Sequence, residues 1–224
     1  PWELNKTETI DVMDALGSNI RVDARGAQVM RVLPRLNEDI NEEWISDKTR
    51  YAIDGLRRQR LDTPFERGLD GRLHPISWDE ALKSLATALR KSKPKAIAAV
   101  AGDQADAESM FALKSLMTRL GTSNIDCRQD GAKIGGKRAS YLFNSTIAGI
   151  DNADALLIIG SNPRIEAAVL NARIRRNWLS SRMPIGVVGP KIDLTYDADF
   201  FGESPSNLDE IAVGTHKFAA KLKK

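Results

Sequence analysis

Short apolar segments of strand length alternate with longer segments of helical periodicity from Ser77 onward, and this alternation constrains the fold more than any other feature. The apolar segments are residues 96–101, 124–127, 155–159 and 185–188. Strands that are joined by helices form a parallel sheet through right-handed crossovers, with helices covering both faces. The sequence therefore predicts an α/β fold with a parallel sheet and flanking helices.

The first helix of this region has an N-terminal signal and an apolar face. Ser77 and Glu80 fit a capping box, in which each side chain satisfies a backbone N–H group of the first turn. Apolar residues follow at helical spacing and predict a buried face, made of Trp78, Ala81, Leu82, Leu85 and Leu89. Pro94 is expected to end this helix.

Three more helices are predicted, over residues 106–120, 164–179 and 207–222. Gly121 is the expected stop of the first of them. Arg173, Arg175 and Arg176 fall near the end of the second, where the helix dipole favours positive charge. An acidic partner for these arginines is the alternative explanation.

The first part of the chain has the pattern of a small antiparallel sheet. Segments 7–13, 20–22 and 28–33 alternate apolar with polar residues and are separated by glycine-containing turns. In the third segment, the alternation places Val29 and Arg31 on one face and Met30 and Val32 on the other. The polar segment 35–50, around Trp44, is predicted to be irregular.

These two patterns divide the chain into a β-rich module, residues 1–56, and an α/β domain, residues 57–224. Three strands alone are marginally stable, so the module is expected to lean on the larger domain. No segment approaches the roughly 20 apolar residues of a membrane-spanning helix. The start Pro1-Trp2-Glu3-Leu4 lacks a signal peptide's apolar region, and we expect both ends to be cuts within a longer sequence.

Composition excludes several classes of function. The single cysteine, Cys127, excludes a disulfide framework and a cysteine-ligated cluster or zinc site, and is expected to be a small buried hydrophobe. His74 and His216 are too far apart to suggest a metal site. The net charge is only +3, with 33 basic against 30 acidic residues, so no nucleic-acid partner is predicted. The tryptophans Trp2, Trp44, Trp78 and Trp178 are interpreted as packing anchors.

Two glycine-containing segments are candidates for ligand binding. Gly131–Arg138 approaches a phosphate-binding P-loop, but Arg138 stands where a serine or threonine would hold magnesium. A connection is the preferred interpretation, and a basic phosphate or nucleic-acid module using Lys133, Lys137 and Arg138 remains an alternative.

The second candidate is Gly160–Pro163, at the carboxyl end of a predicted parallel strand, where open α/β sheets bind ligands. Backbone N–H groups of the following helix could bind a phosphate there. The alternative is a strand-to-helix turn capped by Ser161 or Asn162. No acid, base or nucleophile lies beside this segment, and no catalytic, cofactor-binding or metal-binding residue is predicted in the chain.

Two groups of segments resemble a known family. Residues 61–64, 71–73, 76–82 and 150–163 resemble signatures of the molybdopterin oxidoreductase superfamily. Residues 2–4, 11–22, 41–50 and 127–131 are more particular and resemble the large iron–sulfur subunits of respiratory complex I of the mitochondrial and alphaproteobacterial kind. Together these resemblances cover essentially the whole chain.

The resemblance implies an iron–sulfur domain at the start, which in the superfamily uses a Cys-x2-Cys-x3-Cys run and a later fourth cysteine. Asp14 and Ser18 stand at the second and third places, and Ser46 stands at the fourth. Because oxygen side chains cannot form a thiolate cage, the resemblance implies that this cluster is absent. It also implies a pterin domain that has lost its molybdenum cofactor.

The function so implied is that of a cofactor-free structural and interaction segment of NADH:quinone oxidoreductase. The full-length subunit is expected to carry 2Fe-2S and 4Fe-4S clusters N-terminal to Pro1. Expected partners are other peripheral-arm subunits, on the matrix side or the cytoplasmic side of a bacterial inner membrane, with membrane association only through the complex. The alternative is a fragment of a molybdopterin-dependent oxidoreductase that binds the pterin nucleotide near Gly160–Pro163.

Overall fold

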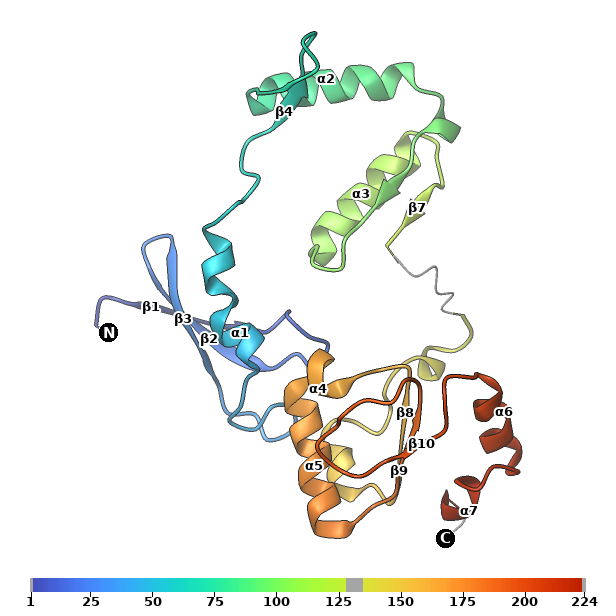
Figure 1. Cartoon of the computed structure of the whole chain (residues 1–224). Helices are drawn as coiled ribbons and strands as arrows, with labels where there is room; N and C mark the ends of the chain where they lie inside the picture. The colour runs from blue at the N-terminus through green and yellow to red at the C-terminus, as the bar shows by residue number, and fades with distance from the viewer. Residues whose placement is uncertain (1, 128–134, 223–224) are drawn as a thin grey trace. The chain divides into compact units, whose positions relative to one another are not determined.

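The computed structural model describes residues 2–127 and 135–222. The chain forms two compact units, one made of residues 1–57 with 138–224 and the other of residues 58–137. Figure 1 traces the elements of both units along the chain. The predicted division into residues 1–56 and 57–224 stays a prediction, although its boundary coincides with the end of the first segment of the first unit.

The first unit begins with the predicted antiparallel meander. Strands β1 (Asn5–Ile10), β2 (Asn19–Arg25) and β3 (Gln28–Pro34) pair in the order β1-β2-β3. One face of this sheet carries a small buried cluster of Ile20, Val32 and Ile45, against which Val22, Val29 and Ile53 pack. The meander is thereby confirmed as an element with its own small core.

The predicted facing of β3 is wrong because the strand contains a bulge. Asp23 pairs with Arg31, but the neighbouring Ala24 pairs with Val29, so that Met30 is an additional residue in β3. The bulge shifts the alternation by one residue. Val29 and Val32 therefore pack against the same cluster, and Met30 is exposed.

An ion-paired carboxylate lies on the central strand of this sheet. The Asp23 side chain is completely buried and accepts hydrogen bonds from Arg21 Nε at 2.8 Å and from Arg31 Nε at 2.7 Å. Hydrogen bonding from Arg21, with that from Arg31, lowers the pKa of Asp23 below its ordinary value of 3.8, against the opposing effect of burial. The two guanidinium groups thus compensate the burial of this charge.

The segment after β3 is more regular than predicted. Helix α1 (Asp47–Tyr51) continues into the 3₁₀ helix η1 (Ala52–Leu56). Ser46 caps α1, because its hydroxyl oxygen accepts the backbone N–H of Thr49. A five-residue helix is too short to produce a readable periodicity, which explains why the sequence pattern missed it.

A parallel sheet forms the main core of the first unit. Strands β8 (Leu156–Ile159), β9 (Ile185–Val188) and β10 (Asp199–Phe200) pair in the order β10-β9-β8, and β9 is buried throughout. The two longer strands match the prediction. The third, β10, has only two residues and gave no signal in the sequence. The core consists of Ile150, Ile158, Ile174, Met183, Ile185, Val187 and Leu194.

Two predicted helices of this unit are each divided. The segment predicted as one helix from 164 to 179 forms α4 (Pro163–Glu166) and α5 (Ala168–Ser181), because Ala167 has an extended φ of −149°. The last predicted helix forms α6 (Ser206–Val213) and α7 (Ala219–Leu222). Gly214, with a φ of +81°, ends α6 in the left-handed conformation that glycine favours.

The second unit contains an unpredicted hairpin of β4 (Phe65–Arg67) and β5 (Leu73–Pro75), followed by α2 (Trp78–Lys91). The capping box of α2 is confirmed, since Ser77 and Glu80 each accept the backbone N–H of the other. Strands β6 (Ala99–Val100) and β7 (Ile125–Asp126) form a parallel pair around α3 (Ala107–Arg119). Short 3₁₀ turns complete the chain: η2 (Pro94–Ala96), η3 (Arg138–Ser140) and η4 (Ala148–Asn152).

The structure thus confirms a mixed α/β fold with parallel sheets, helices and a small antiparallel sheet, and corrects some predicted burial. The apolar face of α2 is mostly exposed, including Trp78, Leu82 and Leu85. Cys127 is exposed rather than buried. Trp2 and Trp44 are also exposed, so neither is a packing anchor within the chain. Within residues 2–127 and 135–222, no helix combines the length and apolar character that a membrane crossing requires.

The lowered pKa of Asp23 predicts a pH-dependent contribution to stability. A carboxyl with a lowered folded pKa stabilises the fold above its unfolded value of 3.8, and this contribution is lost as the pH falls through the folded value. We therefore expect Asp23→Asn to lower the thermal unfolding midpoint at pH 7, and to lower it by less at pH 2, which lies below the unfolded value of 3.8. Glu8→Gln, an exposed partner of Arg35, is the control. An equal loss at both pH values would contradict the prediction.

Candidate functional site

The first candidate site is where the superfamily's cluster ligands would lie. Ser18 and Ser46 are both buried there, and Asp14 is half-buried. The structure joins these positions through two residues that the sequence prediction had not singled out, Asp11 and Thr49. The backbone N–H of Asp11 donates to the Ser18 carbonyl at 2.8 Å. Thr49 Oγ1 donates to Asp11 Oδ2 at 2.5 Å and lies 3.0 Å from Ser46 Oγ.

The hydroxyl protons of this site can be assigned from its chemistry. An ionised carboxylate only accepts hydrogen bonds, so the single hydroxyl proton of Thr49 goes to Asp11. Ser46 must then donate its own proton to Thr49 Oγ1, while its oxygen accepts the Thr49 backbone N–H at 3.3 Å. We call Ser46, Thr49 and Asp11 the oxygen chain. All three residues are buried, and each hydroxyl proton has an acceptor within the oxygen chain.

Asp14 lies beside the oxygen chain in a less favourable environment. Its Oδ1 accepts the Leu16 backbone N–H at 3.0 Å, whereas its Oδ2 is buried without a hydrogen-bond partner among the described residues. Burial raises the pKa of Asp14 above 3.8; the charge of Asp11 adds to this effect, and the Leu16 N–H and Lys48 oppose it. The site therefore disfavours a second negative charge.

The second candidate site, Gly160–Pro163, is the predicted turn at the carboxyl end of β8. Gly160 has a φ of +62°, and its N–H donates to the Val188 carbonyl of β9 at 2.8 Å. Ser161 donates to Glu166 at 2.7 Å, and Asn162 precedes α4 without making a side-chain capping bond. Asn162 Oδ1 is buried and has no hydrogen-bond partner among the described residues.

The third candidate, the P-loop-like segment Gly131–Arg138, lies partly outside the described residues. Residues 131–134 belong to the undescribed part, and Lys137 and Arg138 are exposed. Its use as a phosphate or nucleic-acid site stays a prediction.

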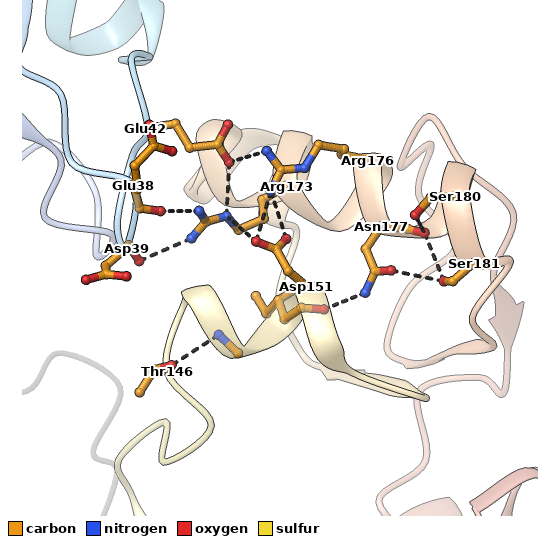
Figure 2. A network of polar contacts seen from close by, with 12 residues as sticks. Glu38, Asp39, Glu42, Thr146, Asp151, Arg173, Arg176, Asn177, Ser180 and Ser181 are labelled. Carbon is orange, nitrogen blue, oxygen red and sulfur yellow. Dashed lines mark hydrogen bonds and ion pairs between the residues drawn. The ribbon is translucent and has the colours of Figure 1, made fainter.

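A buried arginine joins three segments of the first unit (Figure 2). The Arg173 side chain of α5 is only 5% exposed and donates to the carbonyl oxygens of Glu38 and Asp39. Its Nε lies 3.1 Å from Glu42 Oε1 and 3.6 Å from Asp151 Oδ2. This one side chain thus connects the segment after β3, the 3₁₀ helix η4 and α5.

A neighbouring arginine completes the same network. Arg176 lies 2.6 Å from Glu42 Oε1, and its Nη2 lies 2.9 Å from both carboxylate oxygens of Asp151. The hydrogen bonds that Arg176 donates to the Asp151 carboxylate raise the pKa of Arg176. The dipole explanation for these arginines is wrong, because α5 continues to Ser181 and its last turn has no basic residue. Arg173 and Arg176 instead pair with the acidic residues Glu42 and Asp151, whereas Arg175 donates to the Thr195 carbonyl.

Residues 60–224 match the family described as molybdopterin oxidoreductase, and residues 4–54 match the NADH-ubiquinone oxidoreductase NDSU1/NuoG-like, 4Fe-4S domain. The chain belongs to the molybdopterin oxidoreductase family, with a complex I-type 4Fe-4S domain preceding the family domain.

The chain is also similar in sequence to individual curated proteins. The chain is 51% identical over 223 residues to the mitochondrial "NADH dehydrogenase [ubiquinone] iron-sulfur protein 1" of Solanum tuberosum, covering 99% of the chain and 30% of that relative. It is 52% identical over 220 residues to the "NADH-ubiquinone oxidoreductase 78 kDa subunit, mitochondrial" of Candida albicans, covering 96% of the chain and 30% of the relative. The protein of the same name from Neurospora crassa is 48% identical over 229 residues, again covering 99% and 30%. The chain thus spans about 30% of the length of the curated relatives it matches.

The residues of the matched 4Fe-4S domain do not fit an iron–sulfur cluster. Such clusters are held by cysteine thiolates, with histidine as an occasional substitute. Residues 4–54 contain neither, since the only cysteine is Cys127 and the histidines are His74 and His216. Across the described ranges, no group of three or more histidine, cysteine, aspartate or glutamate side chains is placed to hold a metal ion.

The Arg173 network predicts a large difference between neighbouring arginines of α5. Arg173→Met should lower the free energy of unfolding by about 3 kcal/mol, because it leaves Glu42 and two backbone carbonyls short of a buried partner. Arg175→Met is the matched control, since Arg175 is exposed and donates to the Thr195 carbonyl at 3.2 Å. Urea-induced unfolding measures both, and equal losses would refute the role given to Arg173.

The environment of Asp14 predicts a stabilising substitution. A carboxyl with a raised folded pKa stabilises the fold fully below its unfolded value, and this contribution is lost as the pH rises through the folded value. Asp14→Asn should therefore raise the thermal unfolding midpoint at pH 7 and lose this advantage below about pH 3. Asp54→Asn, an exposed aspartate of η1, serves as the control. A lower midpoint for Asp14→Asn at pH 7 would show that its charge is needed.

Proposed function

We propose that the chain is a cofactor-free structural and interaction segment of the large iron–sulfur subunit of an NADH:quinone oxidoreductase. The observation that carries this proposal is the matched 4Fe-4S domain without a thiolate or imidazole in residues 4–54. The relatives, which are 48–52% identical, are named as iron–sulfur or 78 kDa subunits of NADH dehydrogenases that use ubiquinone. Family membership and ligand loss together favour a scaffold over an electron carrier.

In this proposal the chain positions other parts of a larger assembly. The 2Fe-2S and 4Fe-4S clusters of the full-length subunit lie N-terminal to Pro1, in a part of the protein that passes electrons from NADH towards quinone. Other peripheral-arm subunits are its partners, and it meets the membrane only through the complex, on the matrix side or on the cytoplasmic side of a bacterial inner membrane. Nucleic acid is not a partner, since the net charge is only +3.

The exposed apolar face of α2 supports the finer prediction for the α/β domain. In this proposal residues 57–224 form one domain whose parallel sheet is covered by helices on both faces. Trp78, Leu82 and Leu85 are more than half exposed within the chain, which is costly for apolar side chains at helical spacing. Other parts of the longer protein would cover this face.

A second candidate function is favoured by one observation at Gly160–Pro163. Asn162 Oδ1, beside the turn at the carboxyl end of β8, is buried and finds no hydrogen-bond partner within residues 2–127 and 135–222. A donor on a pterin nucleotide could satisfy this oxygen, and residues 60–224 match the molybdopterin oxidoreductase family. The chain would then be a fragment of a molybdopterin-dependent enzyme.

Metal analysis decides between these two functions. We expect anaerobically purified protein to contain no stoichiometric iron, molybdenum or tungsten, since the described residues offer no ligand set for iron and the scaffold needs none. Inductively coupled plasma mass spectrometry measures all three elements on one sample. Molybdenum or tungsten near one per chain would overturn the scaffold proposal in favour of the pterin-binding function, and stoichiometric iron would refute the proposed loss of the cluster.

A further inference from the structure

The loop between β1 and β2 is attached to the rest of its sheet module by side chains that are distant in sequence. Residues 11–18 connect the two strands, and both Asp11 and Ser18 at its ends are buried. Short-range bonds hold the loop from within, such as those from Met13 N–H to Asp11 Oδ1 and from Leu16 N–H to Asp14 Oδ1. The bond from Thr49 to Asp11 spans 38 positions and reaches the loop from α1.

By the resemblance described above, Ser18 and Ser46 stand at two of the cluster-ligand positions, and Ser46 belongs to the oxygen chain. Ser46 is the N-cap of α1, and Thr49 lies in that helix. Ser18, at the second end of the loop, accepts the Asp11 N–H through its carbonyl oxygen. A cluster would cross-link these segments through its ligands; the oxygen chain links the same segments through hydrogen bonds.

We propose that the oxygen chain Ser46–Thr49–Asp11 takes over the structural role of the missing iron–sulfur cluster by fixing the β1–β2 loop to α1. This inference rests on the proposed function, because it assumes that the module carries no cluster. The oxygen chain is suited to this role because a buried carboxylate that accepts an O–H hydrogen bond is a strong acceptor. Because Ser46 donates to Thr49 and Thr49 donates to Asp11, the hydroxyl protons of the oxygen chain have a single arrangement.

The Thr49 hydroxyl group makes the buried bond between α1 and the loop, and its removal leaves the exposed contact from Lys48 Nζ to the Met13 carbonyl at 3.4 Å. Thr49→Val keeps the shape of the side chain, removes the donor to Asp11 and removes the acceptor for Ser46. The buried Asp11 carboxylate then loses its partner from α1, and the unfolding equilibrium constant is expected to rise about 10- to 100-fold. Thr7→Val is the matched control, since Thr7 is exposed on β1.

The experiment combines unfolding with local amide exchange on the full 224-residue chain. In Thr49→Val, Asp11 loses its bond to α1. The amides of Asp11 and Met13, whose hydrogen bonds involve Asp11, should then exchange faster, while the amides of β9 keep their wild-type protection. Thr49→Ser retains the hydroxyl and should restore most of this protection. Asp11→Asn combined with Thr49→Val should be less harmful than the sum of the two single changes.

The outcomes distinguish this inference from the proposed function. If wild-type protein is free of iron but Thr49→Val behaves as Thr7→Val does, the oxygen chain has no such role and the scaffold proposal is unaffected. Equal exchange at Asp11, Met13 and β9 would likewise overturn the inference, because the loss would be global. If Thr49→Val fails to fold, folding of Thr49→Ser supports the inference, and failure of Thr49→Ser overturns it. Stoichiometric iron in the wild type would refute the proposed function itself.

Discussion

The burial of the Arg173 guanidinium determines how the first unit is assembled. A buried cation is stable only when acceptors surround it, and here they come from Glu38, Asp39 and Glu42 after β3 and from Asp151 in η4. Glu42, Asp39 and Glu38 lie 131, 134 and 135 positions from Arg173 in the sequence. The antiparallel sheet has a small core of its own, so this network gives it a fixed attachment to α5 and, through Ile174 of that helix, to the parallel sheet.

Two polar clusters in the N-terminal module show different solutions to buried charge. Asp23 is neutralised by two arginines of the same sheet, whereas Asp11 is stabilised by hydroxyl and backbone donors alone. Asp14 is the exception, since one of its oxygens has no donor in the part of the chain that the structure describes. The buried polar groups of this module thus rely on guanidinium, backbone N–H and hydroxyl donors supplied by the module itself.

Local sequence patterns predicted much of the fold, and the predictions that were wrong have physical explanations. The capping box of α2, the stop at Gly121 and the strand at Ile185–Val188 depend on neighbours within one turn or one strand. The break at Ala167 and the bulge at Met30 depend on packing partners and carry no such signal. The candidate sites show the same difference. Gly160–Pro163 was predicted correctly to lie at a strand end. Asp11 and Thr49 were missed because each becomes a candidate only through its hydrogen bond to the other.

The sequence by itself determined the mixed α/β class, the antiparallel meander and the absence of thiolate ligands from residues 4–54, because periodicity, caps and residue identity are local properties. The tertiary structure alone decided which charges meet. Arg173 lies 131 positions from Glu42, and Thr49 lies 38 positions from Asp11, so their bonds exist only once the chain has folded. Burial strengthens these contacts, because hydrogen bonds and ion pairs are electrostatically stronger in the low-dielectric interior than in water.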